Sequence, residues 1–190
     1  MHVTMTHVNL SGYHVPMPDD PARLEAPRLP VDPIAAAKTL WADHGWAEAA
    51  DGMAAVTSLM RAHQIALSRV EAALRPLDIS FARYEVLMLL YFSRRRSLPM
   101  RTIGSRLQVH QTSVTNAVDR LEAAGLVARK PHPTDRRATL VELTEEGLAV
   151  AEKATAALND GVFRRPGLPP EGVATLVSVL AAMRHEAGDF

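Results

Sequence analysis

The sequence has no cysteine, few aromatic residues (5%) and no long apolar run among its 190 residues. Without cysteine it forms no disulfide bonds, zinc–cysteine sites or thiol redox sensor. No apolar run approaches the roughly 18 residues that a membrane-spanning helix needs. The N-terminal residues lack the basic segment and apolar stretch of a secretory signal. We therefore expect a cytoplasmic protein that is not associated with a membrane.

The chain also has no net charge, since 21 basic residues balance 21 acidic ones. A neutral chain at first argues against a nucleic-acid partner, but the charges are unevenly distributed. Residues 94–137 hold ten basic and three acidic residues, which gives this segment a formal charge of +7 and leaves −7 for the remainder. A basic module in an acidic scaffold attracts phosphates on one face only.

Enzymatic motifs are missing as well. The sequence has no G-x-S-x-G or H-E-x-x-H motif and no glycine-rich phosphate loop. The histidines form no tight cluster with carboxylates, so we expect neither a metal site nor a cofactor. These absences favour a protein that binds rather than catalyses.

The most informative stretch is residues 109–125, which predict a helix with two contrasting faces. One face is an apolar stripe formed by Val114, Val118 and Leu121. The opposite face carries small polar side chains, centred on Thr112 and Asn116. Amides and hydroxyls of this kind can reach base edges in a major groove. The alternative is an ordinary solvated helix face.

The flanking segments predict a winged helix. A short helix over 101–107 precedes the polar helix at helix-turn-helix spacing. After Gly125, a predicted C-cap, two short strands surround a polar turn over 131–137, which indicates a β-hairpin. The first strand is predicted over 126–130 and the second over 138–143. A helix-turn-helix with a basic hairpin attached is a far more specific pattern than either part alone.

The segment LPMRTIGSRLQVHQTSVTNAVDRLEAAGLVARKPHPTDRRATLVELTEEG resembles the winged-helix core of MarR-type transcriptional regulators. Asp135-Arg136-Arg137, followed by Leu143-Thr144 and Gly147, fits the family's D-x-R and L-T-x-x-G wing signature. The resemblance covers residues 50–187 in layout and is closest over 98–147. It implies a homodimer that represses transcription by reading a pseudo-palindromic operator in double-stranded DNA.

The predicted fold class is mainly α with a small β-hairpin wing, a winged helix-turn-helix core flanked by dimerisation helices. Residues 1–33, which hold six of the thirteen prolines, are expected to be irregular or disordered. Residues 34–50 predict an extra N-terminal helix. Residues 51–80 and 145–190 predict the dimerisation region, and residues 81–144 the DNA-binding domain. The terminal helices carry apolar stripes that a second subunit would cover.

The resemblance implies that the recognition helix, residues 110–124, enters the major groove and that the wing, residues 131–137, enters the minor groove. The wing arginine expected in the minor groove is Arg137, while Asp135 braces the wing by pairing with Arg136 or Arg137. Arg120 is interpreted as a phosphate contact. The predicted DNA-binding residues are Arg101, Thr102, His110, Gln111, Thr112, Ser113, Thr115, Asn116, Arg120, Asp135, Arg136 and Arg137.

A small aromatic or phenolic ligand that releases DNA is typical of the family. An arginine or histidine among aromatic rings would suit an aromatic acid. The candidates, chosen by placement on the helices that would wall such a pocket, are Trp46, His63, Arg69, Phe81 and Tyr84. Packing within the body or the interface is the alternative for Trp46 and His63. Two other functions remain open, a winged-helix protein–protein interaction module and a metal-responsive regulator.

Overall fold

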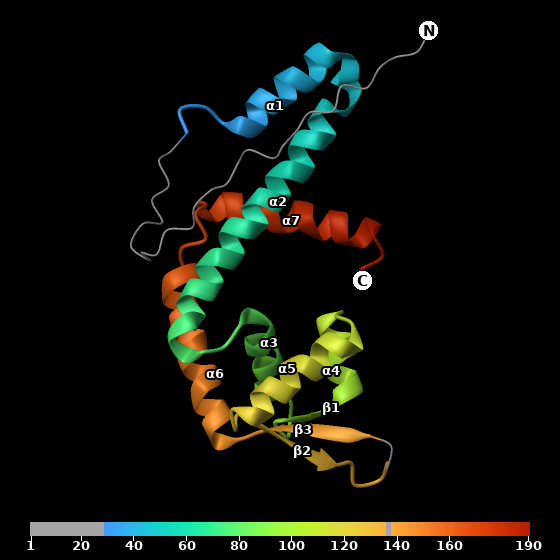
Figure 1. The fold of residues 1–190 in the computed structure, drawn as a ribbon, viewed down its shortest axis with the longest axis vertical. Helices are drawn as coiled ribbons and strands as arrows, with labels where there is room; N and C mark the ends of the chain where they lie inside the picture. The colour runs from blue at the N-terminus through green and yellow to red at the C-terminus, as the bar shows by residue number, and fades with distance from the viewer. Residues whose placement is uncertain (1–28, 136–137) are drawn as a thin grey trace, which may run out of the picture. The chain divides into compact units, whose positions relative to one another are not determined.

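The computed structural model describes residues 29–135 and 138–190 (Figure 1). The described residues are mainly helical, with a small antiparallel sheet, as the sequence predicts. They form two compact units divided after Leu59, and helix α2, Ala47–Leu74, continues from the first unit into the second. The predicted irregular extension lies almost entirely outside the described residues.

The first unit is a helical hairpin formed by α1, Pro33–Trp41, and the beginning of α2. The side chain of Asp32 caps α1 by accepting a hydrogen bond from the backbone N–H of Ile34 at 2.9 Å. A turn of π-helix, Ala42–Trp46, reverses the chain, and its Gly45 adopts a φ of 87°. Lys38 of α1 forms an ion pair with Asp51 of α2. Residues 34–50 therefore contain the predicted extra helix, although α2 begins at Ala47 rather than at residue 51.

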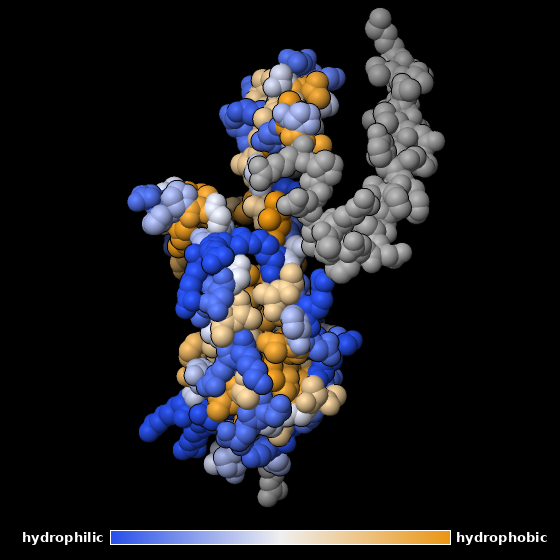
Figure 2. All heavy atoms as spheres, turned by 90° about the vertical axis from the view of Figure 1, so that its left-hand side faces the viewer, coloured by the Kyte–Doolittle hydropathy of each residue, from blue (hydrophilic) through white to orange (hydrophobic). Residues whose placement is uncertain are grey.

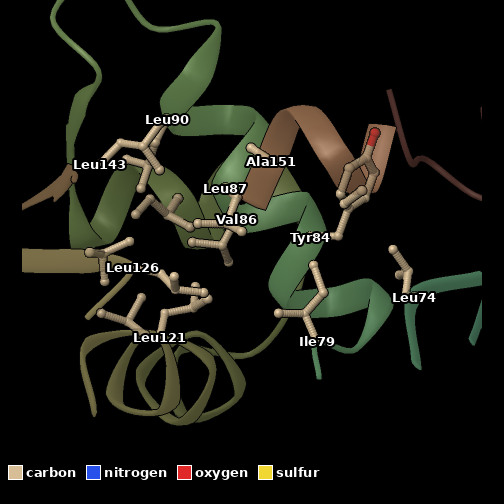
Figure 3. Packing of buried hydrophobic residues seen from close by; sticks show 14 of the residues in the cluster. Leu74, Ile79, Tyr84, Val86, Leu87, Leu90, Leu121, Leu126, Leu143 and Ala151 are labelled. Atoms are coloured by element: carbon tan, nitrogen blue, oxygen red, sulfur yellow. The ribbon is translucent and has the colours of Figure 1, made fainter. Parts of the chain in front are cut away.

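The second unit is built around α3, Phe81–Tyr91, which is apolar on most of its circumference. Ser80 caps α3 by accepting from the N–H of Arg83 at 3.4 Å. The side chains of Val86, Leu87 and Leu90 are almost fully buried. Figure 3 shows them turned toward the side chains of Leu121, Leu126 and Leu143, which come from later segments of the chain. The central position of α3 follows from its composition, since a helix with so little polar surface must be covered by its neighbours.

The helix-turn-helix consists of α4, Met100–Leu107, and α5, Gln111–Ala123. Ile103 of α4 is fully buried, as are Val114, Val118 and Leu121 of α5. These residues are the ones whose spacing predicts a buried stripe. The turn between the helices begins at Gln108, which adopts a left-handed φ of 53°.

The wing is a hairpin of β2, Val127–Pro131, and β3, Thr139–Leu143. A further strand, β1, Ser97–Pro99, pairs antiparallel with β3 and places Leu98 opposite Val141. The sheet order is therefore β1-β3-β2, with β3 in the centre. The sequence analysis predicts the hairpin but not the strand β1.

The L-T-x-x-G motif forms a clasp between the wing and the end of α5. Gly125, at a φ of 73°, ends α5, and the N–H of Leu126 donates to the carbonyl of Leu121 at 2.9 Å. The Thr144 hydroxyl donates to the carbonyl of Gly125 at 2.8 Å and accepts from the N–H of Gly147 at 2.9 Å. Thr144 thereby caps α6, Glu145–Leu158, and fixes it to the junction between α5 and β2.

Beyond α6 the chain continues through a turn of π-helix, Asn159–Phe163, to the last helix, α7, Pro170–Glu186. The Arg69 guanidinium of α2 donates to the carbonyls of Gly161 at 3.3 Å and of Arg165 at 2.5 Å. At the end of the chain, the carbonyl of Asp189 accepts from the amide of Gln108 at 2.6 Å. Polar contacts thus join α2 to the segment after α6, and the end of the chain to the helix-turn-helix.

Apolar side chains reach the surface of the molecule in Figure 2. On α2, Val56 and Met60 are 52% and 61% exposed. On α7, Val177 and Val179 are both 61% exposed. Among the described residues, no helix combines the length and apolar character required to cross a bilayer.

Candidate nucleic-acid interface

The polar face of α5 is open to solvent along the helix. Thr112, Ser113, Asn116 and Arg120 are exposed, whereas Thr115 is half-buried. The Arg120 side chain donates to the Asn116 amide oxygen at 3.2 Å, so the two side chains lie together on one turn. Gln111 lies in the first turn of α5, but its side chain is not among those described. Placing Val114, Val118 and Leu121 in the core leaves the opposite face outward, as the helical spacing predicts.

His110 is the N-cap of α5. Its ring nitrogen Nδ1 accepts a hydrogen bond from the N–H of Thr112 at 3.3 Å and lies 3.1 Å from the Thr112 hydroxyl. The ring is exposed at the end of the helix. His110 therefore has a structural function at the helix N-terminus, next to the residues predicted to contact bases.

Arg129 of β2 joins the wing to α5. Its guanidinium forms ion pairs with Glu122 and, at 2.5 Å, with Asp119. Its backbone N–H also donates to a Glu122 carboxylate oxygen at 3.0 Å. These hydrogen bonds, first from the backbone of Arg129 and then from its side chain, hold the pKa of the Glu122 carboxyl below its usual value of 4.5. The basic charge of Arg129 is thus neutralised within the chain.

A pH titration of stability should reveal this contact. Because the pKa of Glu122 is lower in the folded protein than in the unfolded chain, its contribution is present above the unfolded pKa and lost as the pH falls through the folded one. We expect the free energy of unfolding of wild type to fall more between neutral pH and about pH 3 than that of Glu122→Gln. Urea denaturation at a series of pH values measures this. Glu152→Gln, at an exposed position of α6, should follow the wild-type curve, and a Glu122→Gln curve parallel to wild type would exclude the effect.

The wing and the N-terminus of α4 enclose a cavity of about 460 Å³. Arg101, in the first turn of α4, is exposed, and Thr102 beside it is half-buried. Asp135 is exposed at the tip of the hairpin, whereas Arg136 and Arg137 lie outside the described residues. The structure therefore brings Arg101 and Asp135 to one cavity. Its lining residues are Pro99, Met100, Arg101, Arg129, Asp135, Ala138 and Thr139.

On the side of α5 away from the wing, the N-terminus of α3 contributes two residues that are not among the predicted DNA-binding residues. Ser80 and Arg83 line a cavity of about 250 Å³ together with Ser113, Asn116 and Arg120 of α5. Sequence spacing gives no signal for this proximity, because 30 or more residues separate the two segments. Only the packing of α3 against α5 brings them together.

The five predicted ligand-binding residues are divided between the two units. Trp46 lies in the first unit, 54% exposed, with its ring 5.1 Å from that of Trp41. His63 is exposed on α2. Phe81 and Tyr84 stack with ring centroids 6.0 Å apart, and the Tyr84 hydroxyl lies 3.1 Å from that of Thr155. Because Arg69 binds two backbone carbonyls, its guanidinium already has partners. The cavities beside α5 are lined by other residues.

A metal site would need several converging ligands. Within residues 29–135 and 138–190, no group of three or more His, Asp or Glu side chains is close enough to hold a metal ion.

Comparison by family model and comparison with solved structures both match this chain to the MarR family. The model of the MarR family matches residues 77–138. The crystal structure of Sco5413, a MarR family transcriptional regulator from Streptomyces coelicolor, is 46% identical, with 74% of this chain and 97% of that chain covered and a TM-score of 0.67. The structure of Sco3205 from the same organism, a MarR family regulator in complex with DNA, is 26% identical, with coverages of 70% and 84% and a TM-score of 0.62.

Curated relatives match over a shorter region. The HTH-type transcriptional regulator MhqR of Bacillus subtilis is 39% identical over 67 residues, which are 35% of this chain and 45% of the relative. The chain spans about half the length of the first curated relatives it matches. The match to the family model, residues 77–138, includes α3, the helix-turn-helix and the first strand of the wing, where the candidate interface lies.

Proposed function

Because the chain belongs to the MarR family of transcriptional regulators, we propose that it is a dimeric, sequence-specific regulator that binds duplex DNA and represses transcription. One observation carries the proposal: the polar face of α5 is exposed along the helix while its apolar face is buried in the core. The relative Sco3205, which is similar to this chain, is described in complex with DNA. The family and the named relatives are regulators, not enzymes.

We place α5 in the major groove, where an α-helix fits and base pairs present distinct hydrogen-bonding patterns. Asn116 and Thr112 lie at the centre of the exposed face, so they are the proposed base contacts. An asparagine amide can bond an adenine edge at two points. Arg120, at the later end of the face, is proposed to contact a phosphate.

The wing is proposed to enter the neighbouring minor groove. The position proposed for the wing rests on the sequence, because Arg137 lies outside the described residues. A narrow A·T-rich minor groove attracts a guanidinium. Arg101 at the start of α4 and Asp135 at the hairpin line one cavity, which supports a role for this side of the winged helix next to the DNA backbone.

A dimer would place two recognition helices on the two half-sites of a pseudo-palindrome. The apolar residues exposed on α2 and α7 support this arrangement, since a single chain leaves them in contact with water. We assign residues 51–80 and 145–190 to the dimerisation region and residues 81–144 to DNA binding. A regulator of this kind acts in the cytoplasm.

We also propose that binding of an aromatic acid releases the protein from DNA. Phe81 and Tyr84 form a stacked pair on α3, at the start of the DNA-binding domain. A ring bound beside this pair would perturb the helix on which the core is built. We also propose His63, on α2 of the second unit, as a ligand contact.

Fluorescence anisotropy with a labelled duplex tests DNA binding directly. The duplex comes from the region upstream of the protein's own gene or from selection on random DNA, with a scrambled duplex as control. Asn116→Ala should reduce discrimination between the two duplexes by about 1–3 kcal/mol and weaken non-specific binding much less. Thr39→Ala, at an exposed position of α1 in the first unit, should leave both affinities unchanged. An equal loss on both duplexes would make Asn116 a positioning residue, and no preference in wild type for any selected duplex would refute the regulator.

A protein–protein interaction module is the second candidate function. The exposed apolar residues of α2 and α7 would favour it if they bound a partner protein while the winged helix bound no DNA. Binding that is insensitive to salt would be its signature, because contacts with phosphates weaken steeply as salt rises.

A further inference from the structure

The cavity between α3 and α5 has the composition of an anion site. Its volume is about 250 Å³. Two guanidinium groups, two hydroxyls and one amide face it, and none of its lining residues is acidic. These residues are Ser80, Ala82, Arg83, Ser113, Asn116, Ala117 and Arg120. Ala82 and Ala117 leave room for a group of phosphate size between the longer side chains.

Neither arginine of this cavity is neutralised. Arg83 donates from Nε to the Ser80 hydroxyl at 3.3 Å, and Arg120 donates from Nε to the Asn116 amide oxygen at 3.2 Å. In the described part of the chain, neither forms an ion pair. Arg129, on the other side of α5, differs because Asp119 and Glu122 neutralise it. The positive charge beside α5 that no ion pair neutralises therefore lies on the side of α5 that faces α3.

Acidic residues do lie near the α3 N-terminus. Glu71 accepts a hydrogen bond from the N–H of Phe81 at 3.1 Å, and Glu71 and Asp78 line a neighbouring cavity with Arg75. Ser80 and Arg83 line both cavities, but Arg83 forms no ion pair with either acid. The N–H of Arg83 is bound by the Ser80 hydroxyl. The N–H groups of Phe81 and Arg83 thus have partners, and an anion beside α5 would be held by the guanidinium groups and hydroxyls.

We propose that this cavity binds a backbone phosphate of duplex DNA, on the strand opposite the wing. The inference rests on the proposed function, in which α5 lies in the major groove. That groove is about 12 Å wide and a helix with its side chains is about 10–12 Å across, so sugar–phosphate backbones flank the helix on both sides. The wing faces one backbone. Ser80, Arg83 and Arg120 face the other, which adds α3 to the DNA-binding surface.

The salt dependence of DNA binding tests the site. A protein releases counterions for each phosphate it contacts, and the slope of log K against log salt concentration is about −0.9 per contact. A dimer of Arg83→Gln loses two contacts, so the slope should become shallower by about 1.8 and the affinity should fall about tenfold at low salt. Phosphates carry no sequence information, so a selected operator and a scrambled duplex should be affected equally.

The experiment uses anisotropy on duplexes of about 30 base pairs, which hold two half-sites, between about 50 and 200 mM salt. Arg75→Gln is the matched control, because Arg75 lines the neighbouring cavity with Glu71 and Asp78 but not the cavity between α3 and α5. Arg83→Lys keeps the charge and should keep most of the slope. Thermal unfolding of each variant shows whether the fold is retained.

The outcomes separate the inference from the proposed function. A shallower slope for Arg83→Gln alone supports the phosphate site. A folded Arg83→Gln protein with the wild-type slope, or the same change in Arg75→Gln, overturns it while DNA binding by wild type stands. Loss of affinity for the operator alone would also overturn it, since that would indicate base readout. Failure of wild type to bind any duplex would instead refute the proposed function.

Discussion

A Gly147→Ala variant is expected to have a free energy of unfolding about 3 kcal/mol below that of wild type. Gly147 lies in the first turn of α6, where a methyl group would overlap the carbonyl oxygen of Leu126 and approach the Leu143 side chain at 2.9 Å. That carbonyl belongs to the backbone and also accepts from the N–H of Thr144 at 3.2 Å. Because it cannot rotate away, α6 must move from the junction of α5 and β2.

Gly52→Ala is the matched control for this prediction. Gly52 lies within α2, and a methyl group there meets nothing within 4 Å. Alanine at such a position should stabilise the helix by about 0.5–1 kcal/mol. Urea denaturation followed by circular dichroism, at one fixed protein concentration, measures both variants. Equal stability of Gly147→Ala and wild type would show that the clasp has room for a side chain.

The capping residues and the buried stripe of the winged helix could be predicted because they depend on local spacing. Ser80 and Thr144 cap α3 and α6 in the structure, as their position before apolar helices predicts. The core side of α5 follows from the spacing of Val114, Val118 and Leu121. In each case the signal lies within one helical turn of the residue concerned.

Contacts between distant segments could not be predicted. The strand β1 is three residues long, ends in proline and exists only through its pairing with β3, some 40 residues later. Similarly, the sequence shows that Arg129 is basic but not that two carboxylates of α5 neutralise it. The cavity shared by Arg83 and Arg120 depends on how α3 packs against α5. Net charge alone therefore overstates the positive charge available on the wing side of α5.

The exposed stripe on α2 gives the second large expected effect. Met53, Val56, Met60, His63 and Leu67 recur at alternating spacings of three and four and so share one face of the helix. The same face continues to Val70 and Leu74, which are buried in the second unit. The C-terminal end of the stripe thus packs within the chain. The part of the stripe before Val70, in which Met60 is 61% exposed, is proposed to pack against a second copy of the chain.

We expect Met60→Lys to convert the proposed dimer to a monomer and to weaken operator binding about 100-fold or more. A charge buried in an apolar interface is costly, and a monomer loses the avidity of two linked half-site contacts, which reaches 10²–10⁴. Ala62→Lys is the control, because Ala62 lies about 200° around the helix from Met60 and is exposed. Sedimentation analysis gives the oligomeric state and anisotropy the affinity. If Met60→Lys remains dimeric and binds the operator as wild type does, this face of α2 is not the interface; if Ala62→Lys also dissociates, the effect belongs to added charge on α2 rather than to the stripe.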